Sequence, residues 1–203
     1  MPAILSRKEQ QRLFLLGYQL AFQTTSKKKN WRKIFSLWYA AASNGHKRAQ
    51  FYVGTCYDHA RGVEKNTSIA FDWYLKAAGQ GHMESIYNIG FFYREGEIVE
   101  QDYKKAVKLF TAAAKLGDTE AQRDLGYSYF YGQGVKEDHR KAVYWYKRAA
   151  RKNDLMAFYN LGLCYKHGHG VTQSDRWTIY YFEKARNGGH KGAARQLKKL
   201  GQL

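Results

Sequence analysis

The residues best suited to metal chemistry lie in the last quarter of the chain: Cys164, His167 and His169. Imidazole nitrogens and thiolate sulfurs are the usual zinc ligands, and a structural zinc site needs four such groups. No fourth ligand follows at a recognisable spacing, and His169 stands between two glycines where a related segment has Gln133. We therefore predict no metal site in this region.

Two glycine turns, Gly132-Gln133-Gly134 and Gly168-His169-Gly170, are superficially similar to phosphate-binding loops. A phosphate loop follows a strand and ends in Gly-Lys followed by Ser or Thr, and neither feature occurs here. Elsewhere, no nucleophile, base and orienting acid recur together in a pattern that indicates catalysis. We predict no catalytic residues, no cofactor and no enzymatic activity.

These turns belong to a repeat of 36 residues that fills most of the chain. Blocks 46–81, 82–117, 118–153 and 154–189 align without a gap, and an offset copy covers residues 9–45 if its connecting loop is one residue longer. The ninth position of each block is glycine: Gly54, Gly90, Gly126 and Gly162, with Gly17 in the offset copy. Residues 190–203 begin a further block and end it after one helix, as a terminal cap would.

Each block predicts two helices joined by a turn, because its apolar and small residues recur at helical spacing. Position 21 always carries a side chain that can cap a helix N-terminus, namely Asn30, Asn66, Asp102, Asp138 and Ser174. The last position carries Gly45, Gly81, Gly117 and Gly189, with Asn153 in the remaining block; glycine and asparagine adopt the left-handed conformation that ends helices. A glycine within a helix costs ~1 kcal/mol, so its recurrence at position nine indicates close helix contact.

The motifs LGYSYFYGQGV (125–135) and KAVYWYKRAA (141–150) make the repeat similar to the Sel-1-like repeats, relatives of tetratricopeptide repeats. The resemblance covers about residues 9–203 and implies an all-α, α/α superhelical solenoid of about five helix-turn-helix repeats plus a C-terminal capping helix. We expect a single repeat domain over residues 1–203. Gly96-Glu97-Ile98 and Arg176-Trp177-Thr178 depart from the family pattern and leave the local geometry open there.

Cys56 and Cys164 occupy the same repeat position three repeats apart. Because helices pack ~8–10 Å apart and a disulfide needs Cα atoms within about 7 Å, we predict two free thiols and a reducing, cytoplasmic location. The apolar stretch 13–22 resembles part of a signal peptide but falls in register with the repeat. If an earlier signal has been removed, the protein is secreted or periplasmic. No segment approaches the roughly 20 apolar residues of a membrane span.

In tetratricopeptide-like solenoids the first helix of each repeat lines the concave face, so the resemblance implies a groove formed by repeat positions 3, 6, 10, 13 and 14. Aromatic side chains recur there and suit the recognition of a peptide or a partner's helix. Packing between repeats is an equally good explanation of the aromatics at position 6. The candidate partner-binding residues are Phe14, Tyr18, Phe51, Tyr87, Phe91, Arg123, Tyr127, Phe130, Tyr131 and Tyr159.

The formal net charge is +17, from 34 Lys and Arg against 17 Asp and Glu, which favours anionic partners. Residues 10–57 contain no acidic residue. A candidate anion-binding segment there consists of Lys27, Lys28, Lys29, Arg32 and Lys33. We therefore predict a scaffold or adaptor that binds a protein partner, with the charge favouring an acidic one, and that acts as an inhibitor, immunity or assembly factor. Nucleic-acid or anionic-surface binding through the basic end regions is the alternative, and the sequence assigns no oligomeric state.

Overall fold

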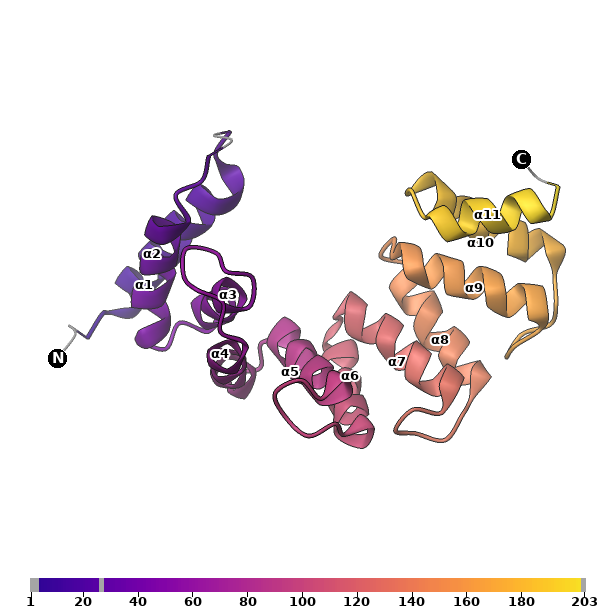
Figure 1. Ribbon diagram of the computed structural model, residues 1–203, viewed down its shortest axis with the longest axis horizontal. Coiled ribbons are helices and arrows are strands. Elements are labelled where there is room, and N and C mark those ends of the chain that lie inside the picture. Colours follow the sequence, from indigo (N-terminus) through magenta and orange to yellow (C-terminus); the bar gives the residue numbers. More distant parts are fainter. Residues whose placement is uncertain (1–3, 26–27, 202–203) are drawn as a thin grey trace. The chain divides into compact units, whose positions relative to one another are not determined.

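The structure is a computed structural model and describes residues 4–25 and 28–201. Throughout these two ranges the regular secondary structure is helical. The chain forms two compact units, residues 1–101 and 102–203. The first contains α1 (Arg7–Tyr18), the π-helical turn η1 (Gln19–Gln23), α2 (Trp31–Ser43), α3 (Lys47–Asp58), α4 (Thr67–Gly79) and α5 (Met83–Glu95). The second contains α6 (Tyr103–Leu116), α7 (Thr119–Tyr131), α8 (His139–Ala150), α9 (Leu155–His167), α10 (Asp175–Asn187) and α11 (Lys191–Lys199) (Figure 1).

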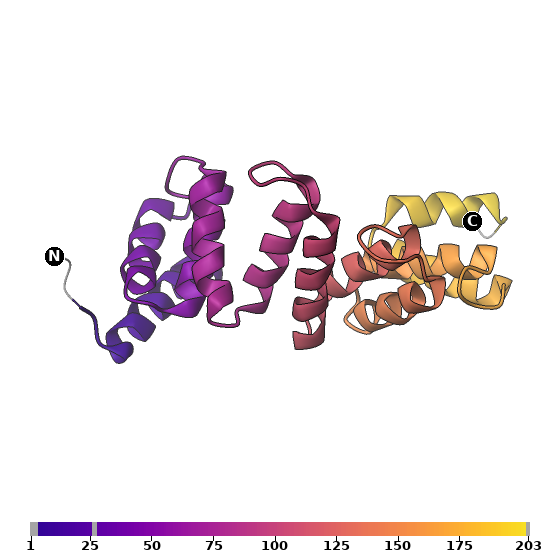
Figure 2. The same ribbon diagram turned by 90° about the horizontal axis from the view of Figure 1, so that it is seen from below.

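Within each unit the helices pack on their neighbours in sequence. In the first unit α1 packs on α2, and the series continues to α5; in the second it runs from α6 to α11 (Figure 2). A short helix pair cannot bury its apolar face alone, so each pair depends on the next one. The fold is an all-α solenoid, as predicted.

The predicted helix ends are confirmed by their hydrogen bonds and dihedral angles. Each residue predicted to cap a second helix accepts a hydrogen bond from the backbone amide three residues later. The predicted terminal glycines all have positive φ, and Asn153 adopts φ 61° in the block that lacks glycine. Caps at both ends satisfy backbone groups that a helix leaves unpaired.

Four of the position-nine glycines lie directly against large rings of the following helix, namely Gly17, Gly54, Gly126 and Gly162. A Cβ atom added to Gly126 would lie 2.7 Å from the Tyr146 ring, and one added to Gly162 would lie 2.5 Å from the Phe182 ring. Tyr146 and Phe182 are themselves almost fully buried. Glycine is therefore required for this approach, which confirms the predicted close contact.

In the offset first repeat, α1 continues into the π-helical turn η1. A π turn holds one more residue than an α turn, which is consistent with the longer connection expected from the sequence. After η1 the chain re-enters the common register at Asn30, whose side chain caps α2.

Each unit has its own apolar core, and each core contains one cysteine. Cys56 packs near Trp38 and Val53, and Cys164 packs near Tyr146 and Leu161. Both cysteines are free thiols, as predicted, and burial raises the pKa of each to about 12. A thiol with so high a pKa is protonated at neutral pH and behaves as a small apolar side chain.

The division between the units falls between Gln101 and Asp102, inside the block 82–117. This block also contains Gly96-Glu97-Ile98, the turn that departs from the family pattern. The expectation of one repeat domain over the whole chain stays a prediction.

Candidate interaction surface

Position 6 of the repeat forms joints between successive repeats. The Phe14 ring stacks on the His46 ring of the next block with centroids 4.7 Å apart, and Phe51 stacks on His82 at 4.7 Å. In the last joint Tyr159 stacks on His190 at 4.4 Å. Phe14, Phe51 and Tyr159 therefore each pack against the first residue of the block that follows.

One joint replaces this stacking by an ion pair. The Arg123 guanidinium donates through Nη1 to Asp154 at 3.2 Å and through Nε to Asp124 at 2.9 Å. Asp154 is the first residue of its block, the position that His46 and His190 occupy in theirs. The contact is formed by the same two repeat positions as in the other joints, but it is an ion pair instead of an aromatic stack.

The first residue of a block also caps the helix that it begins, except at α5, where the His82 side chain makes no such hydrogen bond. The Ala49 amide donates to Nδ1 of His46 at 3.1 Å, and the Ala157 amide donates to the Asp154 carboxylate at 2.6 Å. Because a capping Nδ1 must be unprotonated, His46 serves only in its neutral form. Burial lowers the pKa of His46 and, despite the nearby Glu84 carboxylate, that of His82.

These contacts separate the ten predicted partner-binding residues into two groups. Phe14 is fully buried and Tyr87 retains 8% of its exposure, so the expectation that both line an open groove is corrected. Phe51, Arg123 and Tyr159 are half-buried in the joints, and Tyr18 is half-buried against the Phe22 and Tyr52 rings. Phe14, Phe51 and Tyr159 pack between repeats, which is the second of the two explanations that the sequence left open.

Two exposed candidates, Tyr127 and Tyr131, form a compact cluster with the half-buried Phe130 at the end of α7, which we call the α7 aromatic cluster. The Tyr127 and Tyr131 rings lie 4.5 Å apart and the Phe130 and Tyr131 rings 4.9 Å apart. Tyr127 is 39% and Tyr131 57% exposed. The cluster lines a small pocket of about 50 Å³ that Tyr146, Asn160 and Leu163 complete. The exposed rings of Tyr127 and Tyr131 therefore lie beside a pocket and are both carried by helix α7.

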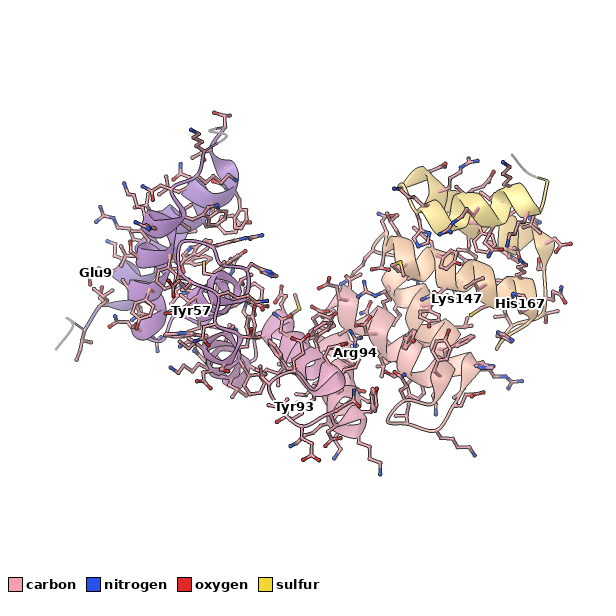
Figure 3. The ribbon with its side chains drawn as sticks, viewed as in Figure 1. Glu9, Tyr57, Tyr93, Arg94, Lys147 and His167 are labelled. Carbon is pink, nitrogen blue, oxygen red and sulfur yellow. The ribbon has the colours of Figure 1, made fainter. Side chains whose placement is uncertain are left out.

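Three histidines extend this surface. The His139 and His169 rings each pack on Phe130, at 4.7 and 5.4 Å, and His167 (Figure 3) stacks on His169 at 5.6 Å. Among the residues that the structure describes, no group of three or more His, Cys, Asp or Glu side chains is arranged to hold a metal ion.

His139 was missed in the sequence because it precedes His169 by most of a repeat. Gly170 signals the contact: an added Cβ there would lie 2.3 Å from the His139 carbonyl oxygen. Gly134 lies equally close to the Tyr103 carbonyl. The second turn glycine therefore packs against the start of the preceding second helix, and this brings the two histidines together.

The candidate anion-binding segment lies before and within the first turn of α2. Lys28, Arg32 and Lys33 are exposed, whereas the Lys29 ammonium donates to the Ala21 carbonyl and lies 5.9 Å from the centre of the Phe22 ring. Lys27 lies outside the described residues. Lys29 therefore helps to hold the loop, and the remaining cations retain the predicted exposure.

A model of the Sel1 repeat matches residues 47–82, 84–118, 119–154 and 156–190. The chain belongs to the Sel1 repeat family. Its helix pairs, glycine contacts and caps are those of Sel1 repeats, which generally serve as scaffolds for protein interaction. The offset copy at residues 9–45 lies outside these matches but forms the same helix pair, α1 and α2.

Solved structures agree with this assignment. A Sel1 repeat protein from Oxalobacter formigenes is 29% identical, with a TM-score of 0.85 over 94% of this chain and 78% of its own. The protective antigen c5321 of uropathogenic Escherichia coli is 31% identical, with a TM-score of 0.82 over 91% of this chain and 39% of its own. The immunity protein Pa5087 of Pseudomonas aeruginosa shares the fold at 23% identity, with a TM-score of 0.60 over 94% of this chain and 69% of its own.

No curated protein sequence is significantly similar to the chain. Over residues 4–25 and 28–201, none of the helices is both long and apolar enough to cross a membrane.

Proposed function

We propose that this Sel1 repeat protein is a non-enzymatic scaffold that binds a partner protein through the α7 aromatic cluster. The observation that carries the proposal is the exposure of Tyr127 and Tyr131 beside a small pocket, while Phe14 and Tyr87 are buried. Aromatic anchors at the edge of a pocket supply much of the binding energy of protein interfaces. Their rings are held on a helix, so little side-chain entropy is lost on binding.

The size of the pocket favours a protein over a small molecule. At about 50 Å³ it is well below the ~300–1,000 Å³ of ligand sites. One apolar side chain of a partner fits such a pocket, with the tyrosine rings packing around it. The net charge of +17 favours a partner with an acidic surface, since complementary charges accelerate association.

The first unit offers a smaller surface of the same type. Phe91 is 37% exposed, and the Arg94 guanidinium lies 4.7 Å from the centre of its ring. The half-buried candidates Tyr18 and Phe51 belong to this unit as well. We propose Phe91 as a secondary contact surface that belongs to the first unit alone.

Inhibitor, immunity factor and assembly factor are all forms that such a scaffold takes. The immunity proteins Pa5087 and PA5088 of P. aeruginosa share the fold at 23% and 22% identity, and therefore support the architecture rather than a common partner. Binding of an anionic surface through Lys28, Arg32 and Lys33 is the rival proposal, and net charge alone favours it.

Site-specific photo-crosslinking in cells of the native host tests the proposal. A photoreactive phenylalanine analogue at Tyr127 or Tyr131 should capture one defined partner, whereas the same analogue at Leu75, which is 45% exposed on α4, should not. With the purified partner, Tyr131→Ala should weaken binding by about 2 kcal/mol without a matching loss of thermal stability. Equal capture from Leu75, or unchanged affinity of both tyrosine variants, would overturn the proposal.

A further inference from the structure

A second hollow lies on a different part of the second unit, where α8 ends beside α10. It has a volume of about 530 Å³, within the range of ligand sites. We call it the α8/α10 groove. Its lining residues are Lys147, Ala150, Arg151, Asn153, Phe158, Trp177, Tyr180, Tyr181 and Lys184.

The charged side chains that line the groove are all cationic. Lys147 (Figure 3), Arg151 and Lys184 contribute three cations, and no acidic side chain lines it. Helix α8 carries no Asp or Glu along its length. The acidic residues of α10, Asp175 and Glu183, are exposed and do not line the hollow. Clustered cations around a concave surface concentrate anions there.

Three aromatic rings cluster at the groove: Trp177 and Tyr181, which line it, and Tyr165, which does not. Tyr165 and Tyr181 are nearly parallel, with centroids 5.5 Å apart and planes at 18°, and Trp177 lies 5.9 Å from Tyr181 at 32°. Trp177 lies 6.0 Å from Tyr165 as well, and Lys147 lies 5.7 Å from the centre of the Tyr165 ring. Trp177, with the Arg176 guanidinium 6.0 Å from its ring, is 42% exposed, and Tyr180 beside it is 43% exposed. The cluster thus presents two exposed rings, Trp177 and Tyr180, on which one more flat ring can stack.

We propose that the α8/α10 groove binds single-stranded nucleic acid, with a base stacked on Trp177 and the adjoining phosphates paired with Lys147, Arg151 and Lys184. Sequence-tolerant binding of single strands combines these same two features, a cationic channel and aromatic platforms. An acidic peptide would use the cations and leave the indole face without a matching ring. A duplex keeps its bases stacked internally and cannot offer one.

This site is independent of the proposed protein interface. The α7 aromatic cluster shares no lining residue with the groove. Tyr131→Ala should therefore leave nucleic-acid binding unchanged, and the loss of one function does not predict the loss of the other.

Fluorescence anisotropy with labelled oligo-dT and oligo-rU of about 12 nucleotides tests the proposal. Trp177→Ala should weaken binding about tenfold, the effect of removing one ring on which a base stacks, while Trp177→Phe should retain most affinity. Tyr180→Ala serves as a second probe at a more exposed ring. It should weaken binding several-fold even if Trp177→Ala perturbs folding.

The charge test compares matched pairs of neutralising substitutions. Lys147→Gln with Arg151→Gln should make the log-log salt dependence shallower by about 0.7 for each phosphate that the variant no longer neutralises. Lys191→Gln with Lys198→Gln on α11 removes the same net charge at two exposed positions outside the groove and should change the slope little. Equal effects of both pairs would show that the strand is held by net charge alone, and would overturn the site.

Competition with unlabelled polyanions distinguishes a single strand from other anionic ligands. A duplex of the same sequence should compete weakly, and poly-glutamate should compete less well per charge than oligo-dT. If poly-glutamate competes equally, the groove recognises acidic protein rather than nucleic acid, and the inference fails. An unchanged affinity of folded Trp177→Ala and Tyr180→Ala variants would overturn it as well.

Discussion

The joint at α3 and the joint at α9 solve one structural problem with different chemistry. At α3 the neutral His46 ring caps the helix and stacks on Phe14, whereas at α9 the Asp154 carboxylate caps the helix and pairs with Arg123. Both residues stand at the first position of a block. At these two joints the first residue of a block both caps its own helix and contacts a side chain of the preceding repeat, whereas His82 stacks on Phe51 without capping α5.

Because one joint is capped by a histidine and the other by an aspartate, their stabilities depend differently on pH. A carboxylate keeps its acceptor role throughout the neutral range, whereas an imidazole loses it on protonation. The side chain at position 6 matches the first residue of the next block: Phe14 stacks on His46, and Arg123 pairs with Asp154. The Phe14 ring is therefore buried in this contact. Substitutions at the two joints can test whether the two chemistries are equivalent.

The largest effect is expected at the ionic joint. Asp154→Ala removes the cap of α9 and leaves the Arg123 guanidinium without one of its carboxylates. Removing a cap costs about 1 kcal/mol, and removing a charged hydrogen bond of a largely buried group costs a similar amount. We expect the free energy of unfolding to fall by about 2 kcal/mol, measured by urea denaturation.

A double-mutant cycle converts this joint into the other type. Asp154→His alone should remain destabilising because Arg123 then faces an imidazole. Adding Arg123→Phe should recover part of the loss, since it recreates the stacked pair seen at Phe14 and His46. Additive effects of the two substitutions would show that the residues of a joint do not act together.

A smaller effect is expected from pH at the aromatic joint. The folded-state pKa of His46 is lowered, mainly by burial, so its contribution to stability is complete above the unfolded pKa of about 6.5. It is lost as the pH falls from there through the folded-state pKa. We expect the free energy of unfolding, measured by urea denaturation, to decrease over this interval by no more than the ~1 kcal/mol of a cap.

His46→Asn provides the control, because asparagine caps a helix without titrating in this range. The variant should show a shallower decrease between neutral pH and pH ~5. Since burial also lowers the pKa of His82, part of the decrease should remain. An identical pH profile for both proteins would show that the His46 cap contributes nothing measurable.

The repeat pattern was sufficient to predict the helices, their caps and the glycine contacts, because these depend on residues within one block. Asn30 and Gly126 show this: the partners of each are set by local helix geometry. The burial of Phe14 was not predictable in the same way. It depends on which residue of the next repeat lies above it, and position 6 is compatible with either packing or exposure.

The two candidate sites show the same limit. Tyr127 and Tyr131 are one helical turn apart and were predicted from the groove positions that the family resemblance implies. The α8/α10 groove joins Lys147 to Trp177, which lie on successive second helices, and Arg176-Trp177-Thr178 had appeared only as a departure from the family motif. A residue that breaks the repeat pattern is informative once the neighbouring helix is placed.

The smallest effect on stability is expected at the turn after the first helix of a repeat, which occurs in both units. Ala60 adopts φ 53°, at the repeat position where Gly96, Gly132 and Gly168 have φ of 74°, 69° and 72°. A left-handed conformation costs a residue with a Cβ atom about 1–2 kcal/mol, and glycine loses about 0.4–1 kcal/mol through its greater freedom when unfolded. We therefore expect Ala60→Gly to raise the free energy of unfolding by about 0.5 kcal/mol, the small balance of these two costs.

Gly132→Ala in the second unit is the reverse experiment. An added Cβ there meets its nearest atom at 3.5 Å, so space is available and the backbone conformation alone decides the outcome. This variant should lose about as much stability as Ala60→Gly gains, with both measured by urea denaturation. If Ala60→Gly is neutral while Gly132→Ala is costly, the turn in the first unit relaxes away from the left-handed region, and the two units do not share this element of the repeat.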